Sequence, residues 1–193
     1  RFQRRLKGKT DTFDAYSAAE AVLSGRASAP PKGGDGLVES LRVLRTSRSS
    51  ALLARTATMN QIKAMLVSSP DELRARYQGL SNVKLIAALA ASRPPKVPLS
   101  PIETCAYSLR LLARRWRMLT EQIQDLSSHM ERLLKDHAPA LMAVFGVGCD
   151  TAAQLLITAG DNPDRLRSEA AFASLTGTCP IPASSGKTNR HRL

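Results

Sequence analysis

The sequence predicts a mainly α-helical protein. Apolar residues recur every three or four positions over its two longest periodic segments, and no stretch of the chain is rich in strand-forming residues. This period is that of one buried helix face. Apolar residues make up 43% of the 193 residues, which is enough to fill a core. The longest apolar run, 85–91, is far shorter than the ~20 residues of a membrane span, so we expect no membrane helix.

The N-terminal part is predicted to contain a basic stretch, a short helix and a linker. Residues 1–9 hold five basic side chains and no acid. An alanine-rich helix is expected over 11–21, and the Gly and Pro residues of 24–36 are typical of a linker. The first residue is Arg1, and the last follows a dense basic stretch. Both ends therefore look cut, and we expect a fragment.

A helix with a partial heptad seam is expected after the linker. The apolar seam runs over 37–65 in steps of three, four and seven, and its two skipped positions are Arg48 and Arg55. Pro70 ends this helix, because proline lacks the backbone N–H that a helix interior needs.

The second long helix has the most regular pattern in the chain. Two short helices, over 70–78 and 82–91, and a proline-rich break at 93–98 precede it. Residues 100–103 supply an N-cap Ser, a first-turn Pro and a Glu at the third helical position. The apolar seam steps by three and four through Ile102, Cys105, Leu109, Leu112, Trp116, Leu119, Ile123, Leu126, Met130 and Leu133.

A single apolar seam needs a partner helix. We predict that the two long helices pair as an antiparallel coiled coil. Ordinary bundle packing and a coiled coil between two chains have the same period, so both stay open. Eight arginines lie on the two helices of this coiled-coil module. Such residues usually form a solvated face, and they can also follow a nucleic-acid backbone. They are Arg42, Arg45, Arg48, Arg55, Arg110, Arg114, Arg115 and Arg117.

A glycine-containing turn is expected after the coiled-coil module. Residues 145–148 read Phe-Gly-Val-Gly and precede a helical run at 151–159. Gly146 and Gly148 would let the backbone turn tightly and direct free N–H groups of the second helix toward an anion, which is a helix-hairpin-helix signature. A helix C-cap followed by a new helix has the same local sequence. One more helix is expected over 165–175.

Charge is the strongest compositional signal. The chain has 28 Lys and Arg against 16 Asp and Glu, a formal charge of +12. Such a surplus favours phosphate-bearing partners over mere solubility. Only 4% of residues are aromatic, which argues against stacking platforms for single strands. Three distant cysteines argue against a disulfide framework, and no signal peptide opens the chain, so we expect a cytoplasmic protein.

Two aspartates at the start of the first expected helix are candidate metal ligands. Asp11 and Asp14 lie three residues apart, so both carboxylates can share one helix face and bind a divalent cation. Asp11 as N-cap with Asp14 in the first turn gives the same spacing. Two carboxylates also form only part of a two-metal site. The spacing alone favours the capping role.

Ser185 is a candidate nucleophile. It is followed by a glycine and three basic residues, Lys187, Arg190 and Arg192, and such cations can offset charge on a transferring phosphoryl group. Ser-Ser-Gly is more commonly a surface turn. The Gly-Lys-Thr at 186–188 lacks the earlier glycine of a phosphate loop, which excludes that motif.

Four segments, taken in order, resemble transposases of the insertion sequence 110 family. They are residues 9–15, the heptad module, residues 145–148 and residues 184–186. Residues 9–15 are similar to the family's Lys-(Ser/Thr)-Asp-x-x-Asp-Ala motif. Residues 171–180 echo its Phe-x-x-Ala-(Phe/Tyr)-x-Gly-Leu-x-Pro stretch, with Thr178 in place of the Leu.

The resemblance implies three parts. Residues 1–36 correspond to the C-terminal remnant of an RNase-H-like domain with a DEDD acidic tetrad, together with a linker. Residues 37–136 correspond to a coiled-coil module. Residues 137–193 correspond to an incomplete C-terminal transposase domain that contains the helix-hairpin-helix.

The same resemblance implies roles for single residues. Asp11 and Asp14 would be the last two acids of the tetrad and would bind Mg²⁺, and Ser185 would be the nucleophile. DNA, a structured guide RNA and further copies of the chain, joined through the coiled coil, are the expected partners. Nucleic-acid contacts are expected from Arg4, Arg5, Lys7, Lys9, Gly146, Gly148, Lys187, Arg190 and Arg192.

The acidic tetrad is only half represented in the sequence, because the strands that carry its first two acids are absent. We therefore expect this chain to bind nucleic acid without transposing on its own. One alternative is a non-catalytic helical nucleic-acid-binding protein, whose binding would not depend on magnesium. Another is a coiled-coil dimerisation protein whose charge only keeps it soluble.

Overall fold

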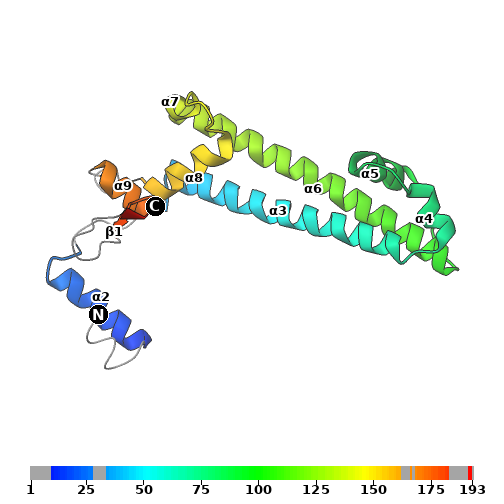
Figure 1. Ribbon diagram of the computed structural model, residues 1–193, viewed down its shortest axis with the longest axis horizontal. Coiled ribbons are helices and arrows are strands. Elements are labelled where there is room, and N and C mark those ends of the chain that lie inside the picture. The colour runs from blue at the N-terminus through cyan, green and yellow to red at the C-terminus, as the bar shows by residue number, and fades with distance from the viewer. Residues whose placement is uncertain (1–9, 28–33, 162–165, 167, 183–190, 193) are drawn as a thin grey trace. The chain divides into compact units, whose positions relative to one another are not determined.

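The computed structural model describes residues 10–27, 34–161, 166, 168–182 and 191–192. The chain divides into two compact units, one over Asp35–Thr158 and the other made of Arg1–Gly34 and Ala159–Leu193. Helices account for most of the described residues (Figure 1), which confirms the predicted mainly α-helical class. None of the described helices is both long enough and apolar enough to cross a membrane.

Two long helices form the body of the unit Asp35–Thr158 (Figure 1). Helix α3 spans Leu37–Val67 and helix α6 spans Pro101–His137. Helix α6 begins with the predicted capping box: the Ser100 hydroxyl accepts a hydrogen bond from the Glu103 backbone N–H at 3.3 Å, and the Glu103 carboxylate accepts one from the Ser100 backbone N–H at 3.2 Å. We call α3 and α6 the long helix pair.

Three clusters of buried side chains hold the long helix pair together. Residue numbers rise along α3 as they fall along α6, so the two helices run antiparallel. From one end to the other, the packed groups are Leu41 with Met130 and Leu134, Ala51 with Leu119 and Ile123, and Ile62 with Leu109 and Ala113. The two predicted apolar seams therefore face each other.

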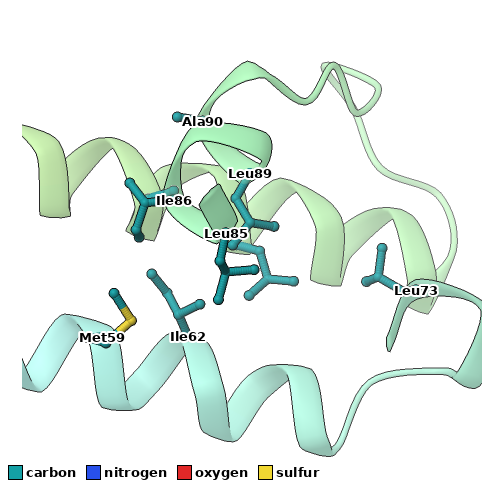
Figure 2. Packing of buried hydrophobic residues seen from close by; sticks show 9 residues of the cluster. Met59, Ile62, Leu73, Leu85, Ile86, Leu89 and Ala90 are labelled. Carbon is teal, nitrogen blue, oxygen red and sulfur yellow. The ribbon is translucent and has the colours of Figure 1, made fainter. Parts of the chain in front are cut away.

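Two short helices connect α3 to α6. Helix α4 spans Asp71–Tyr77 and helix α5 spans Asn82–Ala91, close to the ranges predicted from sequence. Figure 2 shows Leu85 and Leu89 of α5 in the same buried cluster as Ile62 of α3. Helix α5 thus covers one flank of the long helix pair.

Two further helices follow α6. Helix α7 is a single turn, Pro139–Met142, and helix α8 spans Cys149–Ala159. Ala152 and Ala153 have no exposed surface and pack in one cluster with Leu41. Because alanine side chains are small, the α8 backbone can approach the long helix pair closely.

The other unit contains α2 over Asp11–Leu23, α9 over Glu169–Thr176, and the paired strands β1, Ile181–Pro182, and β2, His191–Arg192. Helix α9 begins four residues later than predicted, because Ser168 caps it by accepting a hydrogen bond from the Ala171 N–H at 3.2 Å. The sequence does not predict the strands, since two residues are too few to show an alternating pattern.

Replacing Leu109 by alanine is expected to lower the free energy of unfolding by about 2–5 kcal/mol. Leu109 is fully buried in the cluster between α3, α5 and α6, so the change leaves a cavity. Leu53→Ala is the matched control, because Leu53 lies on the neighbouring helix α3 and is 74% exposed. Urea unfolding followed by circular dichroism measures both; equal losses would contradict the assigned core.

Candidate functional site

Several of the predicted site residues lie outside the described part of the chain. Ser185 is one of them, and so are the basic residues Arg4, Arg5, Lys7, Lys9, Lys187 and Arg190. Arg192 is the second residue of β2. The residues that the structure places are Asp11 and Asp14 on α2, and Gly146 and Gly148 before α8.

Asp11 and Asp14 both lie in the first turn of α2. The N-cap of this helix is Thr10, whose hydroxyl accepts a hydrogen bond from the Phe13 backbone N–H at 3.2 Å. The alternative in which Asp11 caps the helix is therefore wrong. The two carboxylates still interact favourably with the positive end of the helix dipole, but the cap does not need them.

The aspartate pair has the chemistry of a partial magnesium site. Mg²⁺ prefers oxygen ligands and is commonly held by one or two carboxylates together with water and substrate phosphates. Asp11 is exposed and Asp14 is partly buried. Among the described residues no group of three potential metal-ligating side chains occurs. The pair fits magnesium only if water and a phosphate complete the shell.

The Phe-Gly-Val-Gly turn connects α7 to α8. Gly146 has a φ of 84°, a left-handed conformation that glycine adopts without steric cost. Phe145 is fully exposed, whereas Val147 packs into the cluster around Leu41. The helix before this turn is only four residues long, so the helix-hairpin-helix motif stays a prediction.

Asp150, in the first turn of α8, joins three helices. Its two carboxylate oxygens accept hydrogen bonds from Arg48 Nη1 at 3.0 Å and from Arg45 Nη2 at 3.1 Å, both on α3. Arg48 Nε also donates to the Ser127 hydroxyl of α6 at 2.8 Å. We call these four residues the Asp150 clamp. It fixes the start of α8 to the long helix pair.

The second skipped position of the α3 seam is also filled by a paired arginine. The Arg55 guanidinium lies 5.5 Å from the centroid of the Trp116 ring on α6, a cation–π contact. The sequence pattern alone did not predict either pairing, because arginines on a helix usually form a solvated face. The available signal was their position: an arginine at a seam site faces the partner helix.

The two cysteines of the unit Asp35–Thr158 are poor nucleophiles. Burial raises the pKa of both thiols, Cys105 and Cys149. Since the thiolate is the reactive form, both thiols stay protonated at neutral pH. They therefore act as packing residues, not as competitors for the role assigned to Ser185.

Removing the carboxylate of the Asp150 clamp is expected to destabilise the docking of α8. Asp150→Ala leaves two guanidinium groups close together without their shared acceptor, and we expect a loss of about 1–2 kcal/mol, because the site is partly exposed. Asp125→Ala is the control, since Asp125 is an exposed acid whose ion pair is with His129, at 3.5 Å. Hydrogen exchange of the α8 amides measures the effect; equal protection in both variants would contradict the clamp.

Comparison with known proteins adds a family match. Residues 138–193 match the transposase IS116/IS110/IS902 family. The chain is also 23% identical, over 222 aligned positions, to a Mycobacterium paratuberculosis protein named insertion element IS900 uncharacterized 42 kDa protein. That alignment covers 95% of this chain and 56% of the relative, so the chain spans little more than half of that protein's length. No solved structure matches the chain.

The matched segment and the compact units do not share a boundary. The family match begins at residue 138, whereas the unit built on the long helix pair extends to Thr158. Helix α7 and nearly all of α8 therefore belong both to the matched segment and to the unit Asp35–Thr158. Asp150 lies inside this overlap, and the other three residues of its clamp tie the start of the matched segment to α3 and α6.

Proposed function

We propose that this chain, whose residues 138–193 match the IS116/IS110/IS902 family of transposases, cuts and rejoins DNA as part of an insertion-sequence transposase. The match over residues 138–193 is the observation that carries this proposal. The formal charge of +12 supports a phosphate-bearing substrate.

The proposed reaction uses Ser185 as the nucleophile. Its Oγ attacks the phosphorus of a DNA phosphodiester, an Oγ–P bond forms, and the bond to one bridging DNA oxygen breaks. The serine proton is transferred to that oxygen, which leaves as a DNA hydroxyl. The energy of the broken bond is conserved in the serine–DNA linkage, so a second DNA hydroxyl can reverse the step and rejoin the strands. Lys187, Arg190 and Arg192 would offset charge on the phosphoryl group.

Asp11 and Asp14 are proposed to hold Mg²⁺ at the reacting phosphate. When bound, magnesium neutralises charge on the phosphate oxygens and orients them. The aspartates contribute two carboxylates from one turn of α2, and the hydroxyl of Thr10 keeps the helix capped without them. This arrangement supports a role for the pair beyond helix stability.

Three further parts of the proposal come from the family. Residues 1–36 are the end of an RNase-H-like domain; α2 has no buried residue among those described, and its exposed Tyr16 and Leu23 would pack against such a domain. The long helix pair is a coiled coil. A structured RNA guides the protein to DNA, and Gly146 and Gly148 contact phosphates as a helix-hairpin-helix.

The long helix pair is also proposed to join two copies of the chain. A shallow groove of about 620 Å³ lies between α3 and α6, lined on its apolar side by Ala64, Met65, Leu111 and Leu112. Met118, one heptad after Leu111, is 50% exposed. A second long helix pair would cover these side chains, and another subunit would then bring its serine to the aspartate pair.

A covalent protein–DNA adduct is the direct test of the proposed reaction. The complete protein that contains this chain is incubated with guide RNA, magnesium and duplex DNA, and then denatured. We expect a DNA-linked peptide that contains Ser185, identified by mass spectrometry. Strand exchange without such a linkage would contradict the serine mechanism. The chain 1–193 alone is expected to bind DNA without exchanging strands, because it carries two acids of the tetrad.

A further inference from the structure

The long helix pair carries a concentration of positive charge. Residues 104–120 of α6 hold four arginines and no acidic residue, and residues 40–67 of α3 hold five basic residues and no acidic residue. Like charges one turn apart on a helix repel each other by roughly 0.2–0.5 kcal/mol per pair. Such a concentration of like charge does not stabilise the fold unless the basic side chains have acidic or aromatic partners.

The arginines of α3 and α4 have partners within the protein. All six pair with an acidic side chain or an aromatic ring. The pairs are Arg42 with Glu39, Arg45 and Arg48 with Asp150, Arg55 with Trp116, Arg74 with Asp71, and Arg76 with Glu72. The Arg42 guanidinium, for example, lowers the pKa of the Glu39 carboxyl through a hydrogen bond. These six arginines therefore make contacts that help to hold the folded protein together.

Three arginines of α6 differ from these six. Arg110, Arg114 and Arg117 have no ion-pair partner in the part of the chain that the structure describes. Their spacing of four and three places them on one helix face, whereas Arg115 lies on another. Arg114 and Arg117 are exposed. The Nε of Arg110, like that of Arg45, is buried and lacks a hydrogen-bond partner among the described residues, but Arg45 has an ion pair with Asp150.

We propose that Arg110, Arg114 and Arg117 bind the phosphate backbone of duplex DNA. Seven residues of helix span about 10 Å, which matches about three phosphates of one strand at ~3.4 Å each along the duplex axis. We call these residues the α6 arginine face. We assign a polyanion as its occupant, because neither residues 40–67 of α3 nor residues 104–120 of α6 contain a carboxylate that could neutralise these arginines.

A duplex fits this face better than a single strand does. Single-strand binding relies on bases stacked on free aromatic rings. Trp116, the one tryptophan of the chain, already has Arg55 over its ring. The choice of DNA over RNA rests on the proposed transposase function. The binding face itself rests on the charge distribution and on the missing ion pairs.

The test compares two triple variants of the chain 1–193 with equal formal charge. Arg110→Gln/Arg114→Gln/Arg117→Gln removes the α6 arginine face, and glutamine keeps helix propensity. The matched control replaces three paired arginines, Arg42, Arg74 and Arg76, by glutamine. Binding of a 30-base-pair fluorescent DNA duplex is measured by anisotropy at several salt concentrations, and of an RNA duplex of equal length in parallel. Light scattering reports the mass of each variant.

We expect the first variant to bind DNA roughly tenfold more weakly at 0.1 M salt, and its slope of log K against log salt to become shallower by about 3, near one unit per lost phosphate contact. The control should keep the wild-type slope. Four results would each overturn the proposal. They are an equal loss of DNA affinity in both variants, no loss of DNA affinity in either, a loss of affinity confined to RNA, and a changed mass with unchanged DNA binding. DNA binding that depends on this face, in a complete protein that exchanges no strands, would refute the transposase function alone.

Discussion

Replacing Ser185 by alanine is expected to abolish strand exchange by the complete protein and to leave its affinity for DNA unchanged. The substitution removes the oxygen that forms the bond to phosphorus, and loss of a nucleophile typically lowers kcat by roughly 10³-fold or more. The basic residues around position 185 remain, so backbone binding persists. Gel analysis of exchanged DNA strands measures the rate, and anisotropy measures the affinity.

Ser184→Ala is the matched control for this experiment. It removes a hydroxyl from the neighbouring residue of the same Ser-Ser-Gly sequence and should leave both rate and affinity near wild type. Full exchange by Ser185→Ala would show that this segment is only a polar turn. Equal losses in both variants would show that activity needs the Ser-Ser-Gly segment but assigns no distinct role to the Ser185 hydroxyl. Loss of DNA affinity together with activity would show that Ser185 supports binding instead of chemistry.

The regular seam of α6 predicts much of the fold. Residues on that seam, Leu109, Leu119, Ile123 and Met130, are buried in the long helix pair as expected. The heptad period could not predict that Ala113 and Leu134 are also buried. Their burial depends on α5 and α8, which cover a flank of α6. Periodicity records one contact face of a helix and says nothing about which other elements pack beside it.

The seam arginines show a second limit of sequence reasoning. The skipped positions Arg48 and Arg55 mark where α3 departs from an apolar stripe, but the pattern does not identify their partners. Asp150 lies 102 residues after Arg48, and Trp116 is on the second long helix. Such pairs become visible only when the antiparallel pairing and the position of α8 are known.

The sequence predicted the position of the aspartate pair, but not the residue that caps its helix. The spacing of Asp11 and Asp14 places them together in one helical turn, as the structure has them. Spacing alone could not decide which residue caps the helix, because Thr, Asp and Asn are all good N-caps. The Thr10 hydroxyl makes the capping hydrogen bond. Ser185 lies outside the described residues, so its role depends on the family resemblance and on the experiment above.

Asp11→Asn and Asp14→Asn are each expected to lower strand exchange by the complete protein by roughly 10²-fold or more at limiting magnesium. Asparagine keeps the size of the side chain but removes the charge that holds a divalent cation beside a phosphate. Each variant should also need a higher magnesium concentration for half-maximal activity. The first turn of α2 loses only about 0.3–1 kcal/mol of helix-dipole stabilisation, so circular dichroism should show unchanged folding.

Glu20→Gln provides the control on the same helix. Glu20 is an acid six residues beyond Asp14 that pairs with Arg26 at 3.7 Å, so its replacement removes one negative charge and leaves the aspartate pair unchanged. We expect its magnesium dependence to match that of wild type. If all three variants shift the magnesium requirement equally, the effect is one of net charge. If neither aspartate variant shifts it, the pair serves only the helix, and the metal must be held elsewhere.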